Sequence, residues 1–174
     1  MPRVRLAYAD PPYPGQSKRH YGNHPDYAGE VDHVALIATL AEYDGWALST
    51  NSRSLQFCLS LCPPDVRTIV WIKRSAPNFP KHGTYGWEPV IVKGARPPAE
   101  RGLRDWLICE PEMFTFRPKP ANHVVGQKPP PFCEWLFRWF GAEPDDELHD
   151  LYPGSGAVGR AWDAWRSQLV IPCA

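Results

Sequence analysis

The sequence predicts an α/β domain built on a mostly parallel sheet with helices on both faces. Its 174 residues fit one domain, given roughly 100–200 residues per domain. Hydrophobic residues make up 43% and charged residues 22%, a balance that supports a folded core and excludes intrinsic disorder. Short apolar runs alternate with segments of helical periodicity, which is typical of strands joined by crossover helices.

The first half of the chain follows a β-α-β-α-β order. The apolar run 4–9 predicts a strand, which two consecutive prolines end. Apolar residues three and four positions apart predict an amphipathic helix over 29–42. Residues 46–50 and 68–72 are mostly apolar and predict strands. Between them we expect a helix over 54–61, which ends before a Pro-Pro pair.

The second half is less regular and richer in turns. Strands are expected over 88–92, 106–108 and 147–152, and helices over 131–140 and 158–168. The alternation of the first half therefore continues to the end of the chain, which again favours a sheet covered on both faces.

Composition excludes several classes of protein. No stretch approaches the ~18–20 consecutive apolar residues of a membrane helix, and the N-terminus lacks the apolar core of a signal peptide, so we expect a soluble intracellular protein. The motifs GxxxxGK[ST] and GxGxxG are absent, which argues against a P-loop or nicotinamide enzyme. The five cysteines form no CxxC pair. Cys58 and Cys62 stand one helical turn apart, and buried apolar thiols are favoured over a metal site there.

The formal net charge is zero, but the charges are unevenly distributed. Residues 66–128 carry 11 basic and 5 acidic side chains. A solvated surface explains such a segment as well as a phosphate-binding face does.

The first motif that can carry chemistry is Asp10-Pro11-Pro12-Tyr13, which follows the first strand. In open α/β sheets, ligands bind beyond the carboxyl ends of the strands. An ionised Asp10 accepts hydrogen bonds, the prolines remove N–H donors from the loop, and Tyr13 offers a flat face to a base. Together they predict a binding site for a conjugated exocyclic amine. The alternative is a rigid turn with a capping Asp.

The second motif is Asp150-Leu151-Tyr152-Pro153-Gly154-Ser155-Gly156, where a strand opens through glycines into a helix. Glycines let the backbone approach a ligand closely, and an acid at a strand end can hold an ammonium or hydroxyl group. The alternative is an ordinary left-handed turn before a helix.

The two motifs together resemble the amino-methyltransferases of DNA, whose catalytic motif is D/N/S-P-P-Y/F/W and whose cofactor motif is D-P-F-x-G-x-G. The order of the motifs is similar to that of the permuted β-class enzymes, and His123 followed by Lys128-Pro129 resembles their H…K-P element. The segment 85–94 resembles a strand of the DPPW-type RNA adenine methyltransferases. The resemblance implies a single catalytic domain over 1–174 with the Rossmann-like fold of S-adenosylmethionine-dependent methyltransferases.

The resemblance also implies roles for individual residues. Asp10 and the Pro11 carbonyl would bind the amine, with Pro12 completing the loop and Tyr13 stacking on the base. Asp in the first motif points to adenine N6. The residues implied in S-adenosylmethionine binding are Lys128, Asp150, Tyr152, Gly154, Ser155 and Gly156, and no metal is implied. The loop insertions 74–87 and 93–122 leave no room for a separate target-recognition domain.

Charged and aromatic side chains alternate in the segment that follows the third strand. Such a mixture follows a phosphate backbone while stacking unpaired bases. The candidate nucleic-acid contacts are Lys73, Arg74, Lys81, Tyr85 and Trp87. The alternative is that the two aromatic residues are core and the lysines are solvated. Because the target base must leave a duplex or arrive single-stranded, we expect a single-stranded or loosened substrate.

Two further groups have more than one interpretation. His20 and His24 favour a loop over the site, spanning 16–27, rather than a metal site. The aromatic residues at 135, 137, 139 and 140 are expected to be core with one exposed member, or to mark a homodimer face.

We expect an adenine-N6 DNA methyltransferase that uses S-adenosylmethionine and acts in the cytoplasm of a bacterial or virus-infected bacterial cell. An RNA adenine-N6 methyltransferase is the alternative within the enzymes. A catalytically inactive module that binds nucleic acid or a partner is the alternative outside them.

Overall fold

The computed structural model describes residues 2–15, 17, 29–74, 85–111 and 127–169. In this part of the chain six strands form one sheet, in the order β5-β3-β4-β2-β1-β6. The strands are β1 (Arg5–Ala9), β2 (Gly45–Ser49), β3 (Arg67–Ile72), β4 (Trp87–Lys93), β5 (Trp106–Ile108) and β6 (Glu147–Asp150). All neighbouring pairs are parallel except those of β4, which runs against both β2 and β3. The expected mostly parallel sheet is confirmed.

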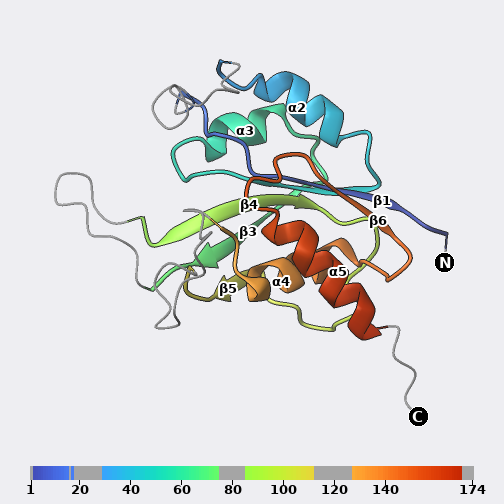
Figure 1. The fold of residues 1–174 in the computed structure, drawn as a ribbon. Coiled ribbons are helices and arrows are strands. Elements are labelled where there is room, and N and C mark those ends of the chain that lie inside the picture. Colours follow the sequence, from blue (N-terminus) through green and yellow to red (C-terminus); the bar gives the residue numbers. More distant parts are fainter. Residues whose placement is uncertain (1, 16, 18–28, 75–84, 112–126, 170–174) are drawn as a thin grey trace, which may run out of the picture.

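Helices cover both faces of the sheet (Figure 1). The helices are α2 (His33–Leu40), α3 (Leu55–Leu61), α4 (Pro130–Phe140) and α5 (Ala157–Leu169). Figure 1 shows α2 and α3 on one side of the sheet and α4 and α5 on the other. Each expected element is present, and the boundaries differ from those expected by a few residues at most ends.

The structure has two hydrophobic cores, one on each face of the sheet, and the side chains of β1 point alternately into them. Leu6 and Tyr8 pack with α4 and α5, whereas Ala7 and Ala9 face α2 and α3. All four are at most 1% exposed. A strand buried on both faces is apolar throughout, which is why the run 4–9 shows no polar alternation.

Two boundaries differ from expectation because polar side chains cap the backbone. α2 begins at His33 rather than at residue 29, since the Asp32 side chain accepts hydrogen bonds from the N–H groups of Val34 and Ala35. β6 ends at Asp150 rather than at residue 152, since the Asp150 carboxylate accepts from the Tyr152 N–H at 3.2 Å and turns the chain there.

The aromatic residues of α4 are all core. Trp135, Phe137, Trp139 and Phe140 are at most 6% exposed and pack between the sheet and α5. The expectation of one exposed member was wrong, because α5 covers the helix face that β4 and β2 do not. Cys58 lies on the inner face of α3 and is buried, as expected for an apolar thiol, whereas Cys62, just after the helix, is only half-buried. In the described ranges, no helix is long and apolar enough to cross a membrane.

Candidate functional site

Two acids lie near each other at the carboxyl edge of the sheet. Asp10 follows the last residue of β1, and Asp150 ends β6, which pairs with β1 in parallel. Tyr8 lies opposite Asp150 in this register, and the Leu151 N–H donates to the Tyr8 carbonyl at 2.9 Å. The parallel pairing therefore brings together the first residues of two motifs that are far apart in the sequence.

Both acids are poorly solvated. The Asp10 side chain is 26% exposed, and its Oδ2 lies 3.1 Å from Lys128 Nζ. Burial raises the pKa of Asp10, and the charge of Lys128 offsets this only in part. Burial also raises the pKa of Asp150, and the Asp10 charge adds to the effect. The two carboxylates therefore receive few hydrogen bonds from water, and an N–H donor bound at this edge could supply them.

Lys128 also pairs with Glu88, a residue that the sequence did not single out. Lys128 Nζ donates to Glu88 Oε1, and Lys73 Nζ donates to Glu88 Oε2 at 2.6 Å. Burial alone would raise the pKa of Glu88, but the two ammonium groups together hold it below its ordinary value. Both ammonium groups lie over the Trp71 ring, 4.2 Å and 5.4 Å from its centroid. The site contains a chain of alternating charges, Asp10, Lys128, Glu88 and Lys73.

Glu88 reaches the site because β4 is reversed. In a parallel strand the first residues lie at the amino edge, away from Asp10. Since β4 is antiparallel to β3, Glu88 lies opposite Trp71, near the carboxyl end of β3. The available signal in the sequence was an ionisable residue near the start of a mostly apolar strand, between Trp87 and Pro89.

The rest of the first motif surrounds Asp10. Pro11 is buried, and Pro12 and Tyr13 are half-buried. The Tyr13 hydroxyl is near enough to Lys128 to affect the pKa of that lysine. Below the motif, the buried Tyr8 hydroxyl pairs with Ser49 Oγ at 2.8 Å. The motif therefore rests on a fully packed strand end.

The loop of the second motif requires its glycines. Gly154 and Gly156 have φ angles of 47° and 70°, in the left-handed region that favours glycine. The Arg160 side chain, from the first turn of α5, donates to the Ser155 carbonyl at 2.7 Å. A Cβ on Gly156 would lie 3.1 Å from Arg160 Nη1. Tyr152 is half-buried at the start of this loop.

Two of the candidate nucleic-acid contacts are exposed aromatic side chains. Tyr85 and Trp87 are 38% and 42% exposed, so the alternative that they are core residues is wrong. The Arg53 guanidinium lies 5.5 Å from the centroid of the Tyr85 ring. Arg74 is exposed at the start of the β3–β4 connection, and Tyr85 lies near its end. These residues form a surface of aromatic rings and cations at the carboxyl edge.

Lys73 and Lys81 are the remaining candidate nucleic-acid contacts. Lys73 is partly buried, and its ammonium pairs with Glu88 within the site. Lys81 lies outside the described residues, as do His20, His24, His123 and most of the expected loop 16–27.

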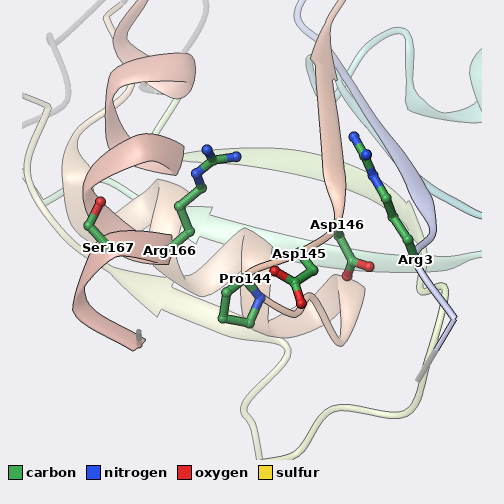
Figure 2. Close-up of a pocket in the computed structure, with 6 residues that line it drawn as sticks. All are labelled: Arg3, Pro144, Asp145, Asp146, Arg166 and Ser167. Atoms are coloured by element: carbon green, nitrogen blue, oxygen red, sulfur yellow. The ribbon is translucent and has the colours of Figure 1, made fainter. Parts of the chain in front are cut away.

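A cavity of about 570 Å³ lies at the opposite end of β6 (Figure 2). Its lining residues are Arg3, Pro144, Asp145, Asp146, Arg166 and Ser167. Asp146 pairs with Arg96, and Arg3 pairs with Glu147. The cavity is remote from Asp150, since Asp146 precedes the strand that Asp150 ends. We therefore place the candidate functional site at the carboxyl edge and not in this cavity.

Solved structures share this fold. M1.HpyAVI in complex with SAM matches with a TM-score of 0.59 and 16% identity, over 94% of this chain and 79% of that chain. A structure of M1.HpyAVI matches with a TM-score of 0.57 and 18% identity, over 94% of this chain and 78% of that chain. This likeness, together with the sheet order, confirms the expected Rossmann-like α/β fold. No family model and no curated protein matches the sequence.

Proposed function

We propose that this protein transfers a methyl group from S-adenosylmethionine to the N6 amine of adenine in DNA. The observation that carries the proposal is the pairing of β1 with β6, which brings Asp10 of the amine-binding motif next to Asp150 of the glycine loop. A methyl transfer needs an amine site and a methyl-donor site that open into each other. The solved complex of M1.HpyAVI with SAM, which shares the fold, supports the same cofactor.

The residues of the second motif fit the cofactor. The left-handed backbone of Gly154 and Gly156 leaves the loop without side chains at these positions, so a ligand can approach the backbone closely. Asp150 supplies a half-buried carboxylate that can accept from an ammonium or a hydroxyl. Tyr152 and Ser155 complete the proposed set. S-adenosylmethionine would supply the methyl group as an electrophile bound to sulfur.

Asp10 and its loop perform the chemistry on the amine. The adenine amine is a poor nucleophile because its lone pair is delocalised into the ring. When the Asp10 carboxylate and the Pro11 carbonyl accept hydrogen bonds from its two N–H groups, the lone pair localises on nitrogen and can attack the methyl group. The electron pair of the broken methyl–sulfur bond would stay on sulfur, which leaves as a neutral thioether. Tyr13 stacks on the base and excludes water. The nitrogen then carries one proton too many, and the Asp10 carboxylate, whose pKa burial raises, accepts it.

Lys128 acts on the amine side in this proposal. The resemblance to the β-class enzymes implies a cofactor contact, but the ammonium pairs with Asp10 and Glu88. A cation beside Asp10 stabilises the ionised carboxylate that the amine requires.

The test is transfer of labelled methyl from S-adenosylmethionine to single-stranded DNA, duplex DNA and RNA. The proposal predicts label on adenine in DNA, with more label on single strands, and its loss in Asp10→Ala. Label on RNA alone would replace DNA by RNA as the substrate. Absence of label on all three, with a folded protein that does not bind S-adenosylmethionine in calorimetry, would favour the inactive binding module.

Trp87 provides a test of the nucleic-acid surface. Base stacking on an aromatic ring contributes about 1–3 kcal/mol per base, so Trp87→Ala is expected to raise KM for single-stranded DNA with little change in kcat. Trp106→Ala is the matched control, because Trp106 is similarly exposed, at 39%, but lies on the edge strand β5. Equal KM values for the two variants would remove Trp87 from the proposed surface.

A further inference from the structure

Glu88 is a buried carboxylate for which the proposed function gives no role. It is 6% exposed, and each of its oxygens accepts from a different ammonium, Lys128 on Oε1 and Lys73 on Oε2. It lies in β4, the reversed strand, and reaches the carboxyl edge only because of that reversal. A buried charge is costly unless it is paired, so this arrangement needs a reason beyond packing.

Lys128 is shared between two acids. Its ammonium pairs with Glu88 and also with Asp10, at 3.1 Å from Oδ2. An ammonium has three N–H donors and no acceptor, so it uses the Asp10 carboxylate in the same way as a substrate amine would. Lys128 and the amine therefore compete for Asp10.

We infer that Glu88 is a positioning residue, which holds Lys128 between two carboxylates and thereby keeps part of the Asp10 carboxylate available to the substrate amine. The inference rests on the proposed function, because it assigns Asp10 to an amine. Lys73 donates to the second oxygen of Glu88 and lies over the Trp71 ring. Because this oxygen is already occupied, Glu88 binds Lys128 through one oxygen only, and Lys128 stays in contact with Asp10.

Glu88 and Lys73 have opposite effects on the pKa of Asp10. The groups that face Asp10 from the neighbouring elements are Lys128, Glu88, Lys73, Asp150, Tyr8 and Tyr13. Among these, the Glu88 charge raises the pKa of Asp10, whereas the Lys73 charge lowers it. Asp10 must be ionised to accept from the amine, so its pKa sets the acidic limb of the rate profile.

The experiment is the pH dependence of kcat and kcat/KM for Glu88→Gln and Lys73→Met. Glu88→Gln removes a negative charge and releases Lys128 onto Asp10, so the acidic limb moves to lower pH and KM for the nucleic acid rises. Lys73→Met removes a positive charge, so the acidic limb moves to higher pH. Glu88→Asp keeps the charge and is expected to keep the wild-type limb. Glu100→Gln is the control, since Glu100 pairs with Arg138 at the surface.

A second readout separates this inference from the proposed function. The carbon-13 shift of the Asp10 carboxyl, titrated in the free protein, needs no methyl transfer. If the wild type transfers no methyl group but the two variants move this titration in opposite directions, the positioning stands and the proposed reaction fails. Shifts of the same sign, or no shift, in both variants would overturn the inference. If Glu88→Gln does not fold, a shift to higher pH in Lys73→Met with no shift in Glu88→Asp supports the inference, and no shift in Lys73→Met overturns it.

Discussion

Two acids at opposite ends of the same strand pair show how differently this fold uses a carboxylate. Asp146 precedes β6 at the amino edge of the sheet, and Asp10 follows β1 at the carboxyl edge. Each is paired with a single well-placed cation, Arg96 in one case and Lys128 in the other. The pKa of Asp146 is lowered and that of Asp10 is raised.

At the amino edge, each oxygen of the Asp146 carboxylate accepts two hydrogen bonds. Both oxygens of Asp146 accept from Arg96, at 2.6 Å and 2.9 Å, and the N–H groups of Val4 and Glu143 donate to them as well. Burial alone would raise the pKa of Asp146, but these four donors outweigh it. The same guanidinium reaches the Pro2 carbonyl, so the pair joins the start of the chain to the connections around β4 and β6.

The carboxyl edge leaves its acid less well satisfied. Lys128 is divided between Asp10 and Glu88, and burial outweighs its charge at Asp10. Comparison of the two edges indicates that pairing alone does not define a structural acid. The number of donors per carboxylate separates a group that stabilises the fold from one that is available to a ligand.

The largest expected effect is loss of stability at the amino edge. Asp146→Asn breaks a buried ion pair and leaves Arg96 with only the more distant carboxylate of Glu143, at 3.7 Å, and breaking a buried pair typically costs about 3–5 kcal/mol. Urea unfolding at neutral pH measures the change. Glu147→Gln is the control, because the Arg3–Glu147 pair is largely exposed. A loss for Asp146→Asn no larger than that of the control would contradict a structural role for this pair.

The next effect separates activity from stability at the carboxyl edge. Asp10→Ala is expected to remove about 2–4 kcal/mol of transition-state stabilisation, or roughly 30- to 10³-fold in methyl-transfer rate, as loss of a positioned electrostatic group does in other enzymes. Binding of S-adenosylmethionine, measured by calorimetry, should change little. Full activity in this variant would show that the first motif is not the amine site.

A smaller effect is expected in the glycine loop. Gly154→Ala places a side chain at a φ of 47°, which costs about 1 kcal/mol or more in this region. We expect weaker binding of S-adenosylmethionine and a rate that recovers at saturating cofactor. Gly102→Ala is the control, since Gly102 also has a positive φ but lies in the loop before β5. Equal cofactor affinities in the two variants would separate the loop from the cofactor.

The smallest expected effect is on the pH dependence of stability, to which Asp10 and Asp146 contribute with opposite signs. The pKa of Asp10 is raised on folding, so its ionisation costs stability as the pH rises through that pKa. Asp10→Asn should therefore unfold at higher denaturant than the wild type at neutral pH, and the gain should disappear below the ordinary Asp pKa of 3.8. The pKa of Asp146 is lowered, so its contribution is present above 3.8 and is lost as the pH falls through the lowered value. A destabilised Asp10→Asn at neutral pH would contradict this difference.

Local sequence pattern was sufficient for the elements and for both acidic motifs. Hydrophobic periodicity and proline pairs predicted the strands and helices, and Asp10 and Asp150 stood at strand ends in the sequence itself. The direction of β4 was not predictable, because a strand of seven residues has the same pattern in either direction. Glu88 was missed for that reason, and Lys128 was assigned to the cofactor only through the resemblance of its Lys-Pro pair to the β-class element, which says nothing of its pairing with Glu88.

The most direct test of the comparison is methyl transfer to adenine in single-stranded DNA by Asp146→Asn and Asp10→Ala, measured together at a temperature where circular dichroism shows both variants folded. We expect label on adenine with Asp146→Asn at close to the wild-type rate, and loss of label with Asp10→Ala. Equal loss in both variants, or label retained with Asp10→Ala, would contradict the assignment of the amino edge to stability and the carboxyl edge to chemistry.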